Sequence, residues 1–133
     1  MLTSEDLEAM GFSYYQELSK TKNKTPLEMS REYAKTTGQK PDPLLYTRLI
    51  KEEFEEWWDE QPPEDELKEL ADLLYVIYGY ANAKGWDVEE AHRRVHANNM
   101  GRMYQPDGSI QRREDGKILR NQDFPPVDLS DLV

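Results

Sequence analysis

The segment from Glu64 to Lys84 constrains the fold of this chain most. It contains no proline and only one glycine, Gly79, and Gly85 follows it as an expected C-cap. Within it the run ELADLLYVIYGYA is apolar nearly all the way round a helix, which predicts a central, buried helix. Asp72 lies inside this run, and an ionised carboxylate at such a place is costly unless something positive meets it. The segment therefore predicts both a central helix and a positive partner for Asp72.

Helical patterns also precede and follow this segment. The run from Lys40 to Pro43 predicts a turn, and Thr25-Pro26 predicts a helix start with an N-cap followed by proline. Gly11 weakens the apolar stripe of the first expected helix. No strong strand pattern competes with them. The expected helices lie over about 4–18, 25–38, 44–61, 64–84 and 87–103. The chain is thus predicted to be all-α, a helical bundle of about four to five helices.

The end of the chain has a different texture. Residues after Tyr104 are rich in turn dipeptides and lack helical periodicity, and Asp115-Gly116 separates two short extended runs that favour a small hairpin. We therefore expect three parts along the chain. They are a helical N-terminal extension (1–24), a helical core (25–103) and an irregular, hairpin-like C-terminal arm (104–133).

Composition narrows the class of protein. A length of 133 residues favours one domain, and a net charge of −10 argues against binding to nucleic acid, which needs a basic surface. The absence of cysteine excludes disulfides and thiolate metal sites and fits a reducing compartment. No signal peptide or membrane-spanning run is recognisable, so we expect a cytoplasmic protein without a membrane partner.

The charge is unevenly distributed along the chain. The stretch from Arg93 to Arg120 carries seven basic and three acidic side chains, a net +4, which leaves −14 for the remainder. An acidic region therefore precedes a basic one.

Two acidic pairs lie in the acidic region, Glu53 with Glu56 and Glu69 with Asp72. Residues three apart share a helix face, so two antiparallel helices would bring four carboxylates together. Converging carboxylates repel each other without a cation, and a hard cation such as Mg²⁺ prefers oxygen ligands. A solvated acidic face is an equally good interpretation of the first pair alone, but it does not explain Asp72.

Several motifs together resemble the MazG-like all-α nucleoside triphosphate pyrophosphatases, especially the small phage and bacterial members. The motifs are LIKEEFEEWW, a spacer of twelve residues after Glu56, ELADLLYVIYG, VHANNMGR and REDGKILR. The resemblance covers roughly residues 25–129. It implies a helical bundle that forms a homo-oligomer, either a dimer or a tetramer built as a dimer of dimers. It also implies a cytoplasmic enzyme of a bacterium or phage-infected cell that uses Mg²⁺, with Mn²⁺ as a substitute.

The resemblance also implies site residues. Glu53, Glu56, Glu69 and Asp72 match the metal-binding motif, with Glu52 as an additional candidate because the register within EEFEE is ambiguous. Glu53 or Glu56 is the expected general base.

For the substrate, the resemblance implies Asn99, Arg102, Lys117 and Arg120, and His96 lies one helical turn before Asn99. Relatives commonly have lysine at the position of Arg102, which leaves the geometry of that contact open. The competing interpretations are a helix-capping role for Asn99 and ordinary exposed charges for Lys117 and Arg120.

The implied reaction is hydrolysis of a deoxynucleoside or nucleoside triphosphate to the monophosphate and pyrophosphate, with dGTP as a first candidate. A dUTP pyrophosphatase and a phosphoribosyl-ATP pyrophosphohydrolase of the same superfamily are the enzymatic alternatives. A non-catalytic acidic binding protein is the alternative from another class, in which the −14 region would be the working surface.

Overall fold

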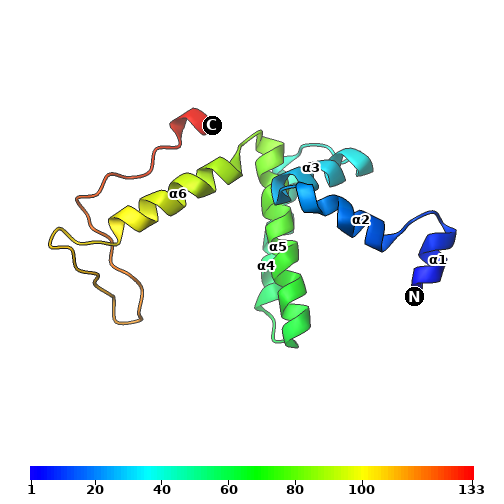
Figure 1. Ribbon diagram of the computed structural model, residues 1–133, viewed down its shortest axis with the longest axis horizontal. Helices are drawn as coiled ribbons and strands as arrows, with labels where there is room; N and C mark the ends of the chain where they lie inside the picture. The colour runs from blue at the N-terminus through cyan, green and yellow to red at the C-terminus, as the bar shows by residue number, and fades with distance from the viewer. The chain divides into compact units, whose positions relative to one another are not determined.

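The computed structural model describes all residues, 1–133, and is all-helical (Figure 1). It contains no strand, and its only β-type pairing is an isolated antiparallel bridge between Arg112 and Ile118. The chain forms two compact units, an N-terminal unit (Met1–Ala83) and a C-terminal unit (Lys84–Val133). The α-helices are α1 (Ser4–Ala9), α2 (Tyr14–Lys20), α3 (Pro26–Thr37), α4 (Pro43–Trp58), α5 (Pro63–Lys84) and α6 (Val88–Arg102).

Helix α3 shows how local chemistry sets the helix bounds. The Thr25 hydroxyl accepts a hydrogen bond from the Glu28 amide, and Pro26 occupies the first turn, where its missing N–H costs nothing. Gly38 ends the helix in the left-handed conformation, with φ of 69°. Asp87 caps α6 in the same way as Thr25 caps α3. These helix starts and stops confirm the predictions from sequence.

The N-terminal segment differs from the prediction of one helix over about 4–18. Helix α1 ends before Gly11, whose φ of 83° does not fit a right-handed helix, and the Ser13 side chain caps a new helix, α2. The apolar stripe is therefore divided between two short helices. This break is why the structure has six α-helices rather than four or five.

The core of the N-terminal unit lies where α3, α4 and α5 meet. Leu27, Tyr46 and Ala81 are its buried apolar residues. The Tyr46 ring packs so closely on Gly79 that a Cβ at this glycine would lie 2.1 Å from the ring. The Asn82 side chain on α5 donates a hydrogen bond of 3.1 Å to the Leu27 carbonyl on α3. These contacts hold α3, α4 and α5 together, and the two acidic pairs lie on α4 and α5.

The expectation that α5 is buried on all sides is wrong for the single chain. Only Gly79 and Ala81 are buried on this helix, whereas Leu67 is 68% exposed and Leu74 is 50% exposed. The side chain of Asp72 is itself 38% exposed. The sequence pattern overestimated the burial of α5. An apolar run shows which faces of a helix can be covered, and a single chain covers only part of them.

In the C-terminal unit the chain after α6 folds back along that helix. The Asn121 amide donates a hydrogen bond of 2.7 Å to the Arg102 carbonyl, and Phe124 packs against Gly101. Arg94 forms a two-pronged ion pair with Asp131, at 2.6 and 3.0 Å. The turn at Asp115-Gly116 and its single bridge match the hairpin-like segment predicted there.

None of the helices combines the length and the apolar character that crossing a bilayer requires.

Candidate active site

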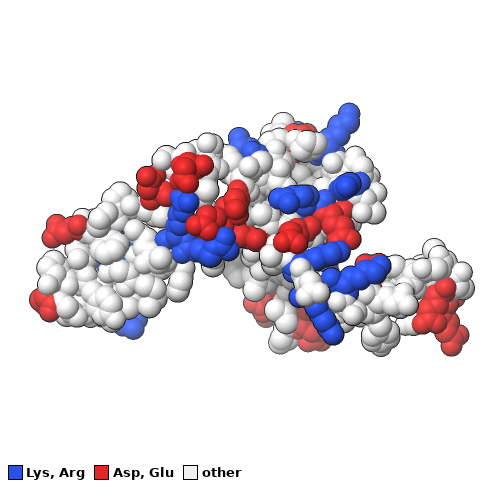
Figure 2. Space-filling view, turned by 45° about the horizontal axis from the view of Figure 1, so that its top comes forward, with Lys and Arg blue, Asp and Glu red and all other residues white.

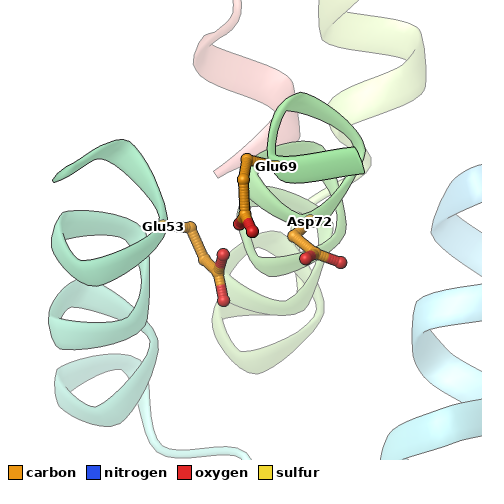
Figure 3. A group of neighbouring side chains, drawn as sticks. All are labelled: Glu53, Glu69 and Asp72. Atoms are coloured by element: carbon orange, nitrogen blue, oxygen red, sulfur yellow. The ribbon is translucent and has the colours of Figure 1, made fainter. Parts of the chain in front are cut away.

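Three carboxylates converge between α4 and α5, and we call them the acidic centre: Glu53, Glu69 and Asp72 (Figure 3). One oxygen from each lies within 4.8 Å of the others. Glu53 comes from α4, and the other two are three residues apart on α5, so they share a face. The predicted convergence of the two acidic pairs is thereby reproduced for these three residues.

Two oxygens of the acidic centre lack the hydrogen bonds that a buried carboxylate needs. Glu53 Oε2 and Glu69 Oε2 are both buried and without a partner. Unpaired buried polar atoms are costly, and here the two belong to groups of the same charge. A donor set made only of carboxylate oxygens suits a hard divalent cation such as Mg²⁺ and does not suit softer metals. The acidic centre therefore fits the metal that the sequence implied.

The electrostatics of Glu53 also favour a cation at the acidic centre. Burial is the largest cause that raises the pKa of the Glu53 carboxyl to about 7, and the charge of Glu56 and a hydrogen bond between the two carboxyl groups contribute to the same shift. Asp72 and Glu69 contribute smaller repulsions of the same sign. The Glu53 pKa thus lies near neutrality, where a general base works best.

Lys68 is the positive group that meets Asp72 in this structure. Its Nζ lies 2.7 Å from Asp72 Oδ2 and 3.4 Å from a Glu69 oxygen, and these hydrogen bonds raise the Lys68 pKa. The residue lies four positions before Asp72 on α5, a spacing at which ion pairs form on helices. Sequence reasoning overlooked Lys68, although this spacing was visible.

The two residues of the first acidic pair, Glu53 and Glu56, differ in their positions relative to the acidic centre. Glu53 belongs to the acidic centre, whereas Glu56 is exposed and reaches the centre only through its contact with Glu53. Glu52 is exposed and is not one of the three grouped carboxylates. Among the four glutamates of the run EEFEE, the structure directs Glu53 toward the carboxylates of α5.

A pocket of about 380 Å³ adjoins the acidic centre, and we call it the tyrosine pocket. Glu53 and Asp72 form part of its wall, and the remaining lining includes Tyr33, Gln39, Tyr46 and Tyr75. Tyr33 and Tyr75 meet edge to face, with ring centroids 5.6 Å apart. Burial is the main cause that raises the pKa of Tyr46 and of Tyr75, so both phenols stay protonated at neutral pH.

Aromatic walls and neutral hydroxyls beside carboxylates suit the base and sugar of a nucleotide. The sequence did not reveal this pocket. Its tyrosines belong to three different helices, and only packing brings them together.

In the C-terminal unit a pocket of about 660 Å³ gathers most of the predicted substrate residues, and we call it the C-terminal basic pocket. Its polar lining includes Asn99, Arg102, Arg113, Lys117 and Arg120. Arg113 was not predicted, and it is held by a two-pronged ion pair with Asp115. His96 is exposed and does not line this pocket.

On the face shown in Figure 2, acidic and basic side chains lie beside one another.

The fold and the acidic centre define a class: all-α proteins that gather carboxylates from neighbouring helices. Comparison with protein families matches residues 13–99 to phosphoribosyl-ATP pyrophosphohydrolase. This match spans well over half of the chain. The chain therefore belongs to the phosphoribosyl-ATP pyrophosphohydrolase family, within the MazG-like nucleotide pyrophosphatases, and is a pyrophosphohydrolase.

The match includes all four predicted metal ligands and Asn99, but it ends before Arg102, Lys117 and Arg120. No curated protein matches the chain significantly.

Proposed function

We propose that this protein is a magnesium-dependent hydrolase that cleaves the α–β phosphoanhydride bond of a nucleoside triphosphate and releases pyrophosphate. The observation that carries the proposal is the acidic centre, with two buried carboxylate oxygens that lack partners. The family match supports the same reaction class.

Glu53, Glu69 and Asp72, with Glu56 beside them, are the residues that would hold the metal. A magnesium ion held there would neutralise charge on the substrate phosphates and would lower the pKa of a water molecule. Glu53 or Glu56 accepts the proton of the attacking water as its oxygen bonds to phosphorus. The bond between the α-phosphorus and the bridging oxygen breaks, and its electron pair leaves on that oxygen with the departing pyrophosphate.

The two pockets have separate roles in the proposal. The tyrosine pocket takes the base and sugar, since it adjoins Glu53 and Asp72 and offers aromatic and hydroxyl groups. The C-terminal basic pocket binds phosphate groups through Arg102, Lys117 and Arg120, none of which forms an ion pair within the chain. Asn99 contributes a neutral hydrogen-bonding group there.

Two substrate classes fit this reaction. Deoxynucleoside triphosphates, with dGTP first, are supported by the likeness of the sequence motifs to those of small MazG-like enzymes. Phosphoribosyl-ATP is the second candidate, favoured by the family match over residues 13–99. Both contain the same bond, so the acidic centre does not discriminate between them.

We also propose that the enzyme works as a homo-oligomer, a dimer or a dimer of dimers. Leu67, Leu70, Leu74 and Ile77 of α5 are each at least 36% exposed in the single chain. Covering such apolar side chains with a second copy would lower the free energy of the assembly. Sedimentation of the full chain measures the oligomeric state, and a monomer at micromolar concentration would contradict this part.

The central test is a substrate panel. Purified protein with Mg²⁺ is given each common nucleoside and deoxynucleoside triphosphate and phosphoribosyl-ATP, and pyrophosphate and orthophosphate are measured separately. We expect pyrophosphate from one substrate class, loss of release with a chelator, and partial recovery with Mn²⁺. Release of orthophosphate alone would contradict α–β cleavage.

A further inference from the structure

A second pocket in the N-terminal unit, of about 310 Å³, has the opposite charge from the acidic centre, and we call it the α3 basic pocket. Arg31 and Lys35 of α3 and Lys40 of the following turn line it. Gln39 and Tyr46 line both this pocket and the tyrosine pocket, so the two lie next to one another.

The three cations lack acidic partners within the chain. None of Arg31, Lys35 and Lys40 forms an ion pair, although their neighbour Lys24 pairs with Glu32. Arg31 and Lys35 are four residues apart on α3, where like charges repel each other. In a chain with a net charge of −10, three unpaired cations lining one hollow are a specific local arrangement. Arg and Lys together are the side chains that bind phosphate.

We propose that the α3 basic pocket binds a phosphate monoester, namely a phosphate at the far end of the substrate from the triphosphate. This inference rests on the proposed function and narrows its substrate class. Asn82 lies across the pocket on α5, and Tyr46 forms the wall shared with the tyrosine pocket.

The spacing along α5 supports this assignment. Asp72 lines the tyrosine pocket, whereas Gly79 and Asn82 line the α3 basic pocket. A helix rises 1.5 Å per residue, so these positions lie about 10 to 15 Å beyond Asp72. A base in the tyrosine pocket, with its triphosphate at the acidic centre, would therefore direct a group on its opposite edge past Tyr46. Phosphoribosyl-ATP carries a second ribosyl phosphate, whereas dGTP carries none.

The first experiment measures binding without catalysis. Ribose 5-phosphate and inorganic phosphate are titrated by calorimetry into metal-free wild-type protein, the double variant Arg31→Gln/Lys35→Gln and the control Lys22→Gln. Lys22 is exposed and lies outside every pocket described above. We expect the double variant to bind ribose 5-phosphate at least about ten-fold more weakly, since charged hydrogen bonds are lost, and the control to match the wild type. Equal binding by all three proteins would overturn the proposal.

The second experiment separates the two sources of phosphate. With phosphoribosyl-ATP, the double variant should show a KM at least about ten-fold higher, whereas KM for ATP, which lacks the distal phosphate, should not change. If the double variant loses only its binding of inorganic phosphate, with KM for both substrates unchanged, the pocket binds free phosphate and the distal-phosphate assignment is wrong.

The outcomes also distinguish this proposal from the proposed function. Absence of pyrophosphate release from every substrate, with ribose 5-phosphate binding still lost in the double variant, would refute the enzymatic proposal and leave the phosphate pocket standing. Pyrophosphate release with no ribose 5-phosphate binding would refute the phosphate pocket and leave the enzymatic proposal standing.

Discussion

The acidic centre and the C-terminal basic pocket are built in opposite ways. Glu53, Glu69 and Asp72 lie on two long regular helices, and their oxygens converge within 4.8 Å. The cations of the C-terminal basic pocket come from the end of α6 and from the irregular chain after it. One site depends on helical periodicity, and the other depends on turns and on packing at particular side chains.

The two sites also differ in the side-chain interactions that stabilise them. Side-chain oxygens stabilise the turns of the C-terminal unit: Asp107 accepts from Ser109, Asp115 from Lys117, and Asn121 from Asp123. In the acidic centre Lys68 contacts Asp72 and Glu69, but Glu53 and Glu69 each keep a buried oxygen without a partner. A framework of helices tolerates this cost, and a cation would relieve it. The turns that carry the basic pocket are therefore stabilised by their own side chains, whereas the acidic centre keeps oxygens that lack a partner.

The largest effect should follow a change at the acidic centre. Glu53→Gln and Asp72→Asn should each lower kcat by about 10² to 10⁴ because a proton acceptor or a metal ligand is lost. Steady-state pyrophosphate release measures this, and circular dichroism checks that the helices are retained. The matched control is Glu55→Gln, on the same helix but outside the acidic centre. Full activity in Glu53→Gln would remove Glu53 from the mechanism.

Packing offers a direct comparison between the two units. A Cβ at Gly79 would lie 2.1 Å from the Tyr46 ring, and one at Gly101 would lie 2.3 Å from the Phe124 ring. We expect Gly79→Ala and Gly101→Ala each to destabilise the fold by about 1 to 3 kcal/mol through overpacking. Urea unfolding measures both.

A further difference is expected in substrate binding by these two variants. Gly101→Ala should also raise KM, because Phe124 holds the chain that returns past the C-terminal basic pocket. Unchanged stability in both variants would show that the two rings move aside freely.

A smaller effect is expected in the C-terminal basic pocket. Lys117→Gln should raise KM by about ten-fold and leave kcat nearly unchanged, since the lost contact is to phosphate in the bound state. Substrate titration measures both constants. Arg93→Gln is the control, because Arg93 is exposed on α6 and does not line the pocket. A fall in kcat with constant KM would instead place Lys117 at the reacting bond.

The smallest effect is a dependence of metal-free stability on pH. The pKa of Glu53 is about 7 in the folded protein and 4.5 ordinarily, so the folded state binds more protons between these values. The free energy of unfolding should therefore fall as pH rises through this window, and Mg²⁺ should reduce the fall. Thermal unfolding with chelator and with Mg²⁺, from pH 4.5 to 8, measures it. Glu53→Gln should flatten the metal-free curve, and a curve equally steep in this variant would assign the effect to other groups.

Much of the fold followed from local chemistry. Thr25-Pro26, Gly38 and Asp87 act on their own helices through caps and backbone angles, so their roles did not depend on the rest of the chain. Local reasoning was less accurate at Gly11, where a weakened helix turned out to be two helices. The division into an extension, a core and an arm stays a prediction.

The sequence by itself determined the all-α class, the bounds of several helices and the pairing of Glu69 with Asp72, because periodicity and capping act over a few residues. Only the tertiary structure decided that Glu53 faces α5 and that tyrosines from three helices form one pocket. It also showed that Asp72 is only half-buried in the single chain. Those features depend on which surfaces of separate helices meet, and residues far apart in sequence carry no spacing that records it.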